Sequence, residues 1–201
     1  MPDQPVVIFD LGAVLIDWNP RHLYRKLFED EAAMEAFLRD VCTPAWNAEQ
    51  DRGRTWREAV ELLVAEHPQH RDLIQAYRER WHEMLNGPID GSVAILERLD
   101  EGGYELHALT NWSAETFPFA RERYAFLERF RTILVSGEER LMKPDPAIFE
   151  LMLARIGHAA ERCLLIDDSA KNVEAASRLG FDVIHFSSPA QLEAELAGRG
   201  I

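Results

Sequence analysis

The chain has 201 residues, of which 47% are hydrophobic and 28% charged, so it is long enough for one sizeable core or a core with a small inserted domain. Its net charge of −13 argues against nucleic acid or an anionic membrane surface as a partner, because both require basic surface. A small anionic substrate is not excluded, because it needs only a locally positive pocket. No apolar run approaches about 18 residues, so no membrane span is expected.

The cysteine content and the start of the sequence favour a cytoplasmic protein. Two cysteines, Cys42 and Cys163, do not suggest a disulfide scaffold and are expected to be reduced, packed thiols. The first residues carry no basic leader followed by a long apolar segment. The sequence leaves open whether the chain is a monomer or a homodimer.

Short apolar runs rich in Val, Ile and Leu predict five buried strands that alternate with helices. We expect the strands at residues 6–9, 104–109, 132–135, 163–166 and 182–186. Helical periodicity is found at residues 92–101, 114–126, 146–156, 170–179 and 189–196. This alternation is typical of parallel βαβ units with helices on both faces of the sheet, so the predicted fold class is α/β.

One region interrupts the alternation. From about Pro20 to Leu85 the pattern is helical throughout, with amphipathic stripes in RHLYRKLF, WREAVELLVAEH and RDLIQAYRERWHEML and no convincing strand. We interpret this region as a helical insertion after the first strand, with the α/β core resuming near Gly87. The predicted organisation is a core of residues 1–16 and 87–201 and a helical domain of residues 17–86.

Polar residues directly follow several of the predicted strands. In a parallel α/β sheet, ligands bind beyond the carboxyl ends of the strands. The residues at these positions are Asp10, Thr110, Asn111, Lys143, Asp167, Asp168 and Asn172. Converging carboxylates repel one another unless a cation or a shared proton lies among them, and oxygen ligands suit Mg²⁺. A lysine, a hydroxyl and a helix N-terminus would hold phosphate oxygens, so the pattern predicts phosphoryl chemistry with a carboxylate nucleophile.

Four motifs, in order and at strand ends, resemble those of the haloacid dehalogenase superfamily. They are FDLGAVL, LTN, MKPDP and IDDSAKN, and the helical insertion lies where this family has its small helical cap. The resemblance covers the whole chain. It implies a Rossmann-like parallel sheet with strand order 5-4-1-2-3 and a mobile helical-bundle cap inserted after the first strand.

The resemblance also implies catalytic roles. Asp10 would be the nucleophile that forms an aspartyl intermediate, and Thr110 would hold the transferring group. Lys143 would bridge the nucleophile, the phosphate and the acids of the fourth motif. Asn111 would help to neutralise the phosphate oxygens. The implied reaction is hydrolysis of a small phosphorylated metabolite, such as a sugar phosphate.

The same resemblance implies a Mg²⁺ site. Asp10 and Asp168 would be direct ligands, with Asp167 nearby or acting through a water molecule. The carbonyl oxygen of Gly12 would be a further ligand, in place of another backbone carbonyl in the family.

Three further residues are candidates for substrate binding. Trp112 directly follows the second motif, and Trp46 and Arg52 belong to the predicted cap. An arginine in a cap would be well suited to grip a phosphorylated substrate. Each residue has an alternative interpretation, because a tryptophan also packs in cores and an arginine is also found on solvated surfaces.

One residue departs from the family pattern. Most phosphatases of the superfamily have a second aspartate two residues after the nucleophile, as general acid and base, and this chain has Gly12 there. Three interpretations remain: a phosphatase, a metal-independent 2-haloacid dehalogenase, or a degenerate binding protein. A phosphatase would need an easy leaving group or an acid from elsewhere, for which the candidates are Asp17, Asp51, Glu138 and Glu139. A halide needs no acid, but the paired acids of IDDSAKN favour metal and phosphate.

Overall fold

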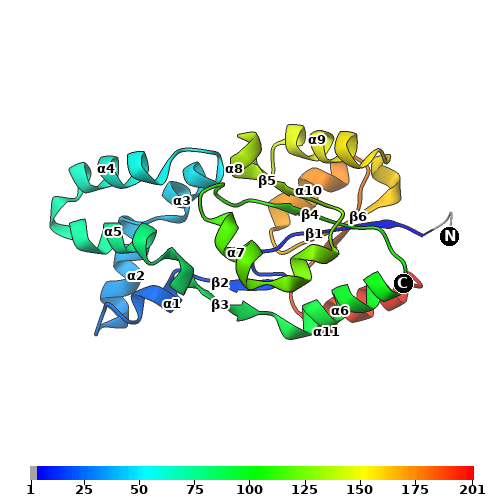
Figure 1. The fold of residues 1–201 in the computed structure, drawn as a ribbon, viewed down its shortest axis with the longest axis horizontal. Coiled ribbons are helices and arrows are strands. Elements are labelled where there is room, and N and C mark those ends of the chain that lie inside the picture. Colours follow the sequence, from blue (N-terminus) through cyan, green and yellow to red (C-terminus); the bar gives the residue numbers. More distant parts are fainter. Residues whose placement is uncertain (1–3) are drawn as a thin grey trace.

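The computed structural model describes residues 4–201, and its centre is a five-stranded parallel sheet (Figure 1). The strands are β1 (Val6–Phe9), β4 (Leu106–Thr110), β5 (Thr132–Val135), β6 (Cys163–Asp167) and β7 (Asp182–His185). Their order across the sheet is β5-β4-β1-β6-β7. Counting these five strands along the chain, the order from the β7 edge is 5-4-1-2-3. The predicted α/β class and strand order are therefore confirmed.

The two faces of β1 pack into two separate hydrophobic cores. Since alternate side chains of a strand point to opposite faces, Val7 and Phe9 lie in one core, and Val6 and Ile8 lie in the other. The second core also contains side chains of α9 (Pro146–Ile156) and α10 (Ala170–Arg178). The first is covered by α6 (Asp90–Glu101), α7 (Phe117–Arg123) and α11 (Pro189–Gly198).

Two predicted elements are shorter in the structure, for local reasons. The strand expected from Tyr104 begins at Leu106, because the Tyr104 N–H bonds to the Leu99 carbonyl at the end of α6. The helix expected over residues 114–126 begins at Phe117, since Pro118 favours the first turn of a helix. It is followed by a 3₁₀ turn, Ala125–Arg129, and another such turn, Ala160–Arg162, precedes β6.

The helices expected over residues 20–85 form a helical insert at one end of the sheet (Figure 1). They are α1 (Arg21–Tyr24), α2 (Glu31–Asp40), α3 (Pro44–Asp51), α4 (Trp56–Glu66) and α5 (Arg71–Glu79), with 3₁₀ turns at Pro68–His70 and Trp81–Met84. Two antiparallel strands join the insert to the sheet, β2 (Ile16–Trp18) and β3 (Leu85–Pro88). Their sequences give little signal, because both are short and β3 contains glycine and proline, which strands rarely contain. The predicted boundaries at residues 17 and 86 fall within this pair.

Cys42 and Cys163 are buried free thiols, as expected. Within residues 4–201, no helix has the length and apolar character required to cross a membrane.

Candidate active site

The carboxyl ends of three neighbouring strands bring the predicted site residues together. β1 pairs with β4 and β6 in parallel, with Phe9 opposite Ala108 and Ile166. The N–H of Asp10 donates to the Ile166 carbonyl at 2.8 Å, which continues the ladder by one residue. Asp10 and Asp167 therefore lie at the same edge of the sheet, one from each strand.

Lys143 is the cation at the centre of this edge. Its Nζ lies 2.9 Å from Asp10 Oδ2 and 2.6 Å from Asp167 Oδ2, and donates to the Leu109 carbonyl at 2.8 Å. Burial lowers the pKa of Lys143, but the charges of Asp10 and Asp167 outweigh it and raise the pKa above its usual value. The Asn111 side chain holds the Lys143 backbone through two hydrogen bonds of 2.9 Å. The predicted contact of Lys143 with both acids is thus present.

The three carboxylates differ in how fully they are paired. Asp167 is completely buried and accepts hydrogen bonds from the Ser169 N–H at 2.8 Å and the Asn172 amide at 3.0 and 3.1 Å, besides its Lys143 contact. Asp10 accepts from the Leu11 N–H at 2.7 Å, and its side chain keeps 11% exposure. Asp168 is exposed. Asp168 is therefore the most accessible of the three carboxylates, and Asp10 is less fully enclosed than Asp167.

This acidic cluster fits a hard divalent cation. One oxygen from each of Asp10, Asp167 and Asp168 lies within 4.8 Å of the other two. Three carboxylates and one ammonium group leave two negative charges, which a divalent ion would balance. Burial raises the pKa of Asp10 to about 7, the Lys143 ammonium opposes that rise, and the charge of Asp167 adds to it. Ionising all three carboxylates is unfavourable without a further cation, and a bound metal ion would offset that cost.

Thr110 offers an unused hydrogen-bonding group beside the cluster. It is fully buried, and its Oγ1 has no partner among the residues that the structure describes. A buried hydroxyl without a partner is costly unless a ligand satisfies it. Thr110 follows Leu109, whose carbonyl binds Lys143, so a ligand near the cluster is within reach of this part of the chain.

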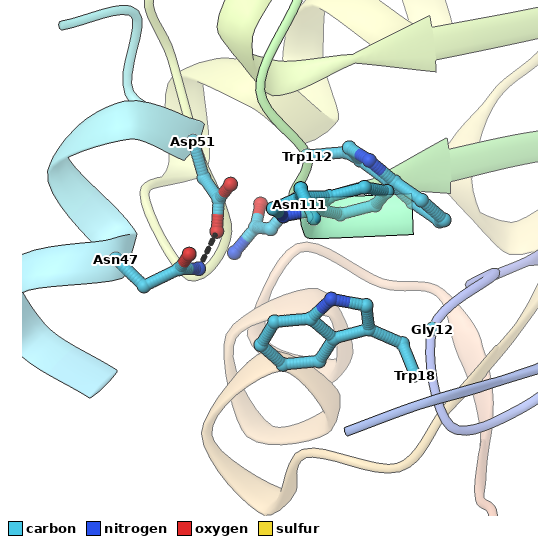
Figure 2. Close-up of a pocket in the computed structure, with 7 residues that line it drawn as sticks. Gly12, Trp18, Asn47, Asp51, Asn111 and Trp112 are labelled. Carbon is cyan, nitrogen blue, oxygen red and sulfur yellow. Dashed lines mark hydrogen bonds between the residues drawn. The ribbon is translucent and has the colours of Figure 1, made fainter. Parts of the chain in front are cut away.

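A small cavity of about 50 Å³ lies between the insert and the strand ends (Figure 2). Its lining comes from both parts of the chain and comprises Gly12, Trp18, Asn47, Asp51, Trp81, Asn111 and Trp112. A Cβ built on Gly12 would meet no described atom within 4 Å. The position where the resemblance leads one to expect a second aspartate is therefore open space, and the predicted residues Asn111 and Trp112 line it.

The two predicted cap residues lie elsewhere in the described structure. Trp46 packs edge-on against Trp56 and Tyr77, with ring centroids 5.6 and 5.1 Å apart. Arg52 follows α3 and lies 3.9 Å from Glu49, with half of its side chain exposed. Neither residue is part of the cavity lining given above.

The four candidates for a replacement acid are also separated by the structure. Asp17 is bound by His22 at 3.1 Å and by Asn86 at 2.9 Å. Glu139 forms an ion pair of 2.7 Å with Arg155, and Glu138 is exposed. Of the four, Asp51 is the one found in the cavity lining of the described chain.

Sequence reasoning did not single out Trp18, Asn47 or Trp81, which also line the cavity. Asn47 and Asp51 are four residues apart on α3 and therefore share one helix face, a signal that was available from the sequence. Trp18 lies on β2, whose pairing with β3 was not expected, so its position depends on tertiary structure.

The parallel sheet with a buried lysine between carboxylates at its carboxyl edge defines an α/β protein with a hydrolase-like site. Residues 7–186 match the family model described as haloacid dehalogenase-like hydrolase. The match covers most of the chain, so the chain belongs to this family of hydrolases.

Two relatives agree with this membership, and a solved structure shows a similar fold. The chain is 27% identical over 191 residues to the phosphorylated carbohydrates phosphatase of Thermotoga maritima, covering 89% of this chain and 83% of the relative. It is 25% identical over 189 residues to the phosphoglycolate phosphatase of Mesorhizobium japonicum, covering 90% and 82%. The fold is similar to HAD family enzyme bt-2542 of Bacteroides thetaiotaomicron, solved with magnesium and inorganic phosphate, with a TM-score of 0.69, 21% identity and coverage of 92% and 95%.

Proposed function

We propose that this chain is a Mg²⁺-dependent phosphatase that hydrolyses a small phosphorylated metabolite through a phosphoaspartate on Asp10. The observation that carries this proposal is the cluster around buried Lys143, whose ammonium holds the buried carboxylate of Asp10 at 2.9 Å. The relatives named as phosphatases of phosphorylated carbohydrates and of phosphoglycolate support phosphate as the transferred group.

For the metal, we propose Asp10 and Asp168 as direct ligands, Asp167 through a water molecule, and the Gly12 carbonyl as a further ligand. The hydrogen bonds that already occupy both Asp167 oxygens support an indirect role for this residue. Magnesium in the structure of the similar fold supports the choice of ion. When bound, Mg²⁺ supplies positive charge beside the phosphate oxygens.

The side chains of this site have complementary tasks in the proposed reaction. Lys143 holds the Asp10 carboxylate in place and offsets negative charge as phosphate approaches. The unpartnered hydroxyl of Thr110 donates to a phosphoryl oxygen. Asn111 fixes the Lys143 backbone, so we assign it a positioning role besides its place at the cavity. Asp10 attacks phosphorus in line with the leaving oxygen, and water then hydrolyses the phosphoaspartate.

The cavity between insert and sheet would take the group to which the phosphate is attached. Three tryptophans line it, and the indole N–H groups of Trp18 and Trp112 have no partner among the described residues. Two unsatisfied donors against aromatic surface suit a leaving group that carries oxygen atoms, such as a carbohydrate. A larger hollow of about 560 Å³ shares Trp18 and Asn47 with this cavity and offers room for a bulkier leaving group.

We propose residues 17–86 as a cap whose movement would admit substrate and exclude water. Trp46 and Arg52 remain proposed substrate contacts on this cap, which would require its closure to bring them nearer.

A panel of sugar phosphates and other small phosphate esters, assayed with Mg²⁺ and with EDTA, tests the proposal. We expect phosphate release that requires Mg²⁺ and is abolished by Asp10→Asn. Asp40→Asn serves as the control, because Asp40 is an exposed residue of α2 paired with its neighbour Arg39. No release from any ester, with ligand binding retained, would favour a binding protein. Chloride release from 2-chloropropionate in EDTA would instead indicate a dehalogenase.

A further inference from the structure

We propose that Asp51 of α3 is the general acid and base of this site, acting from the insert in place of the carboxylate that is missing at position 12. This inference rests on the proposed phosphatase function. It concerns a residue outside the four sequence motifs, on a different element from the nucleophile.

Asp51 shares a cavity with the loop that follows the nucleophile. Asp51 and Gly12 line the same small space, together with Asn111, which directly follows β4 (Figure 2). Since a Cβ on Gly12 would contact nothing within 4 Å among the described atoms, the space beside the loop is available to a side chain from elsewhere. The Asp51 side chain is drawn beside that of Asn111 in Figure 2, at the end of α3 nearest the strand ends.

Hydrogen bonds hold Asp51 in position. Ser136 Oγ donates to the Asp51 carbonyl at 2.5 Å and accepts from the Trp112 N–H at 2.9 Å, so one hydroxyl joins the end of α3 to the strand edge. Asn47, one turn earlier, donates from Nδ2 to Asp51 Oδ2 at 2.9 Å. A group held in place before the substrate binds loses little entropy in the reaction.

The residues after Asp51 hold the same junction. Gly53 has φ +104°, and a Cβ there would approach the Arg140 side chain to 3.0 Å, so this turn requires glycine. The Trp56 N–H donates to Glu115 Oε1 at 2.9 Å, and the Trp56 indole donates to Ser113 Oγ at 3.1 Å. These contacts fix the start of α4 against the loop after β4. Because only a short turn separates the two helices, they also fix the end of α3.

The surroundings of Asp51 favour its protonated form. Burial raises the pKa of Asp51 to about 7, a backbone hydrogen bond from Ser113 lowers it, and the charge of Asp10 raises it. Asp51 is nevertheless only half-buried as a residue, and it lines the cavity. A carboxyl group that still carries its proton near neutral pH is suited to donate it to an alkoxide. The carboxyl accepts hydrogen bonds from the Asn47 amide and from the Ser113 backbone, and the side-chain oxygen of an asparagine at position 51 can still accept from Asn47.

The proposed proton transfers balance over one turnover. As Asp10 bonds to phosphorus and the ester P–O bond breaks, the Asp51 carboxyl gives its proton to the leaving oxygen, and a neutral alcohol departs. The Asp51 carboxylate then takes a proton from water as the water oxygen bonds to phosphorus. The P–O bond to Asp10 breaks, inorganic phosphate leaves, and both aspartates return to their starting states.

The first test compares leaving groups in Asp51→Asn. With an alkyl phosphate from the panel, kcat/KM should fall about 10²–10⁴-fold, because protonating the alkoxide is worth that much. With p-nitrophenyl phosphate, whose leaving group is stable as an anion, kcat/KM should change by less than about threefold. Since the variant also slows hydrolysis of phosphoaspartate, it should give a burst of nitrophenol equal to the enzyme concentration. Glu49→Gln is the matched control, because Glu49 is exposed on the same helix.

The second test is rescue by Gly12→Asp. In the Asp51→Asn background, this change should recover at least tenfold in kcat/KM for the alkyl phosphate, because the new carboxylate has free space. Equal losses for both leaving groups, or no loss at all in a folded Asp51→Asn protein, would overturn the role of Asp51. A wild-type chain that releases no phosphate from any ester would instead contradict the proposed function. The two failures are therefore distinguishable.

Discussion

Replacing Lys143 by methionine should strongly destabilise the protein, because this residue neutralises the centre of the site. Its ammonium makes three contacts of 2.6–2.9 Å, to Asp10, Asp167 and the Leu109 carbonyl, and the side chain is fully buried. Breaking a buried ion pair by removing one partner costs about 3–5 kcal/mol, because the other charge stays buried. The donors that Ser169 and Asn172 supply to Asp167 keep the cost within that range.

Thermal unfolding followed by circular dichroism measures this cost. For a chain of this length, about 2–4 °C is lost per kcal/mol, so the midpoint should fall by roughly 6–20 °C. Lys171→Met is the control, because Lys171 is exposed on α10 near the same edge. Mg²⁺ should raise the midpoint more in Lys143→Met than in the wild type, since the cluster then has three negative charges instead of two. A midpoint within 2 °C of the wild type would refute this account of the cluster.

Activity against pH, the affinity for metal and the packing at the strand edge can each be tested. For an alkyl phosphate, kcat/KM should fall about tenfold per pH unit above about pH 7, because the protonated form of Asp51 is the donor; a pH profile that is flat to pH 9 would contradict this. Asp168→Asn should raise the Mg²⁺ concentration for half-maximal activity at least about tenfold in a metal titration, and an unchanged value would exclude Asp168 as a ligand. Gly137→Ala should cost about 1–3 kcal/mol in urea denaturation, because its Cβ would lie 2.5 Å from the Ala114 nitrogen, whereas Gly198→Ala meets no described atom and should cost nothing.

Burial of Asp51 also links stability to pH. Its pKa is raised in the folded state to about 7, so the unfolded chain holds fewer protons at this position between about pH 4 and 7. The contribution of Asp51 to the free energy of unfolding is therefore at its maximum below about pH 4 and is lost as the pH rises through 7. The free energy of unfolding of Asp51→Asn, minus that of the wild type, should therefore be larger at pH 8 than at pH 4. Parallel urea titrations at the two pH values measure this difference. The opposite trend would contradict the raised pKa.

The sheet and its edge were predictable because their signals are local. Buried runs such as residues 6–9 and 163–166 have too few polar side chains to lie elsewhere than in a parallel core, and each ends in an acid at the sheet edge. The meeting of Asp10 with Lys143 and Asp167 follows from strand order, which the family resemblance supplied.

The insert was predictable in content but not in orientation. Amphipathic stripes locate its helices, but they do not specify which end of α3 faces the strand edge. That orientation depends on contacts between distant residues, such as the Ser136 hydroxyl bound to the Asp51 carbonyl. For the same reason Trp46, an equally plausible candidate in sequence, packs against Trp56 and Tyr77. The sequence offered Asp51 as one of four candidates for the missing acid, and the structure separates them by placing Asp51 in the cavity lining.

The most direct test of the central claim is to trap the phosphoaspartate. During turnover of a ³²P-labelled ester from the panel, the enzyme is quenched in acid, reduced with borohydride and digested with trypsin. The account predicts label in the acid-quenched chain and homoserine at position 10 after reduction, with both lost in Asp10→Asn. Phosphate release without a labelled chain, or label on a residue other than Asp10, would contradict it.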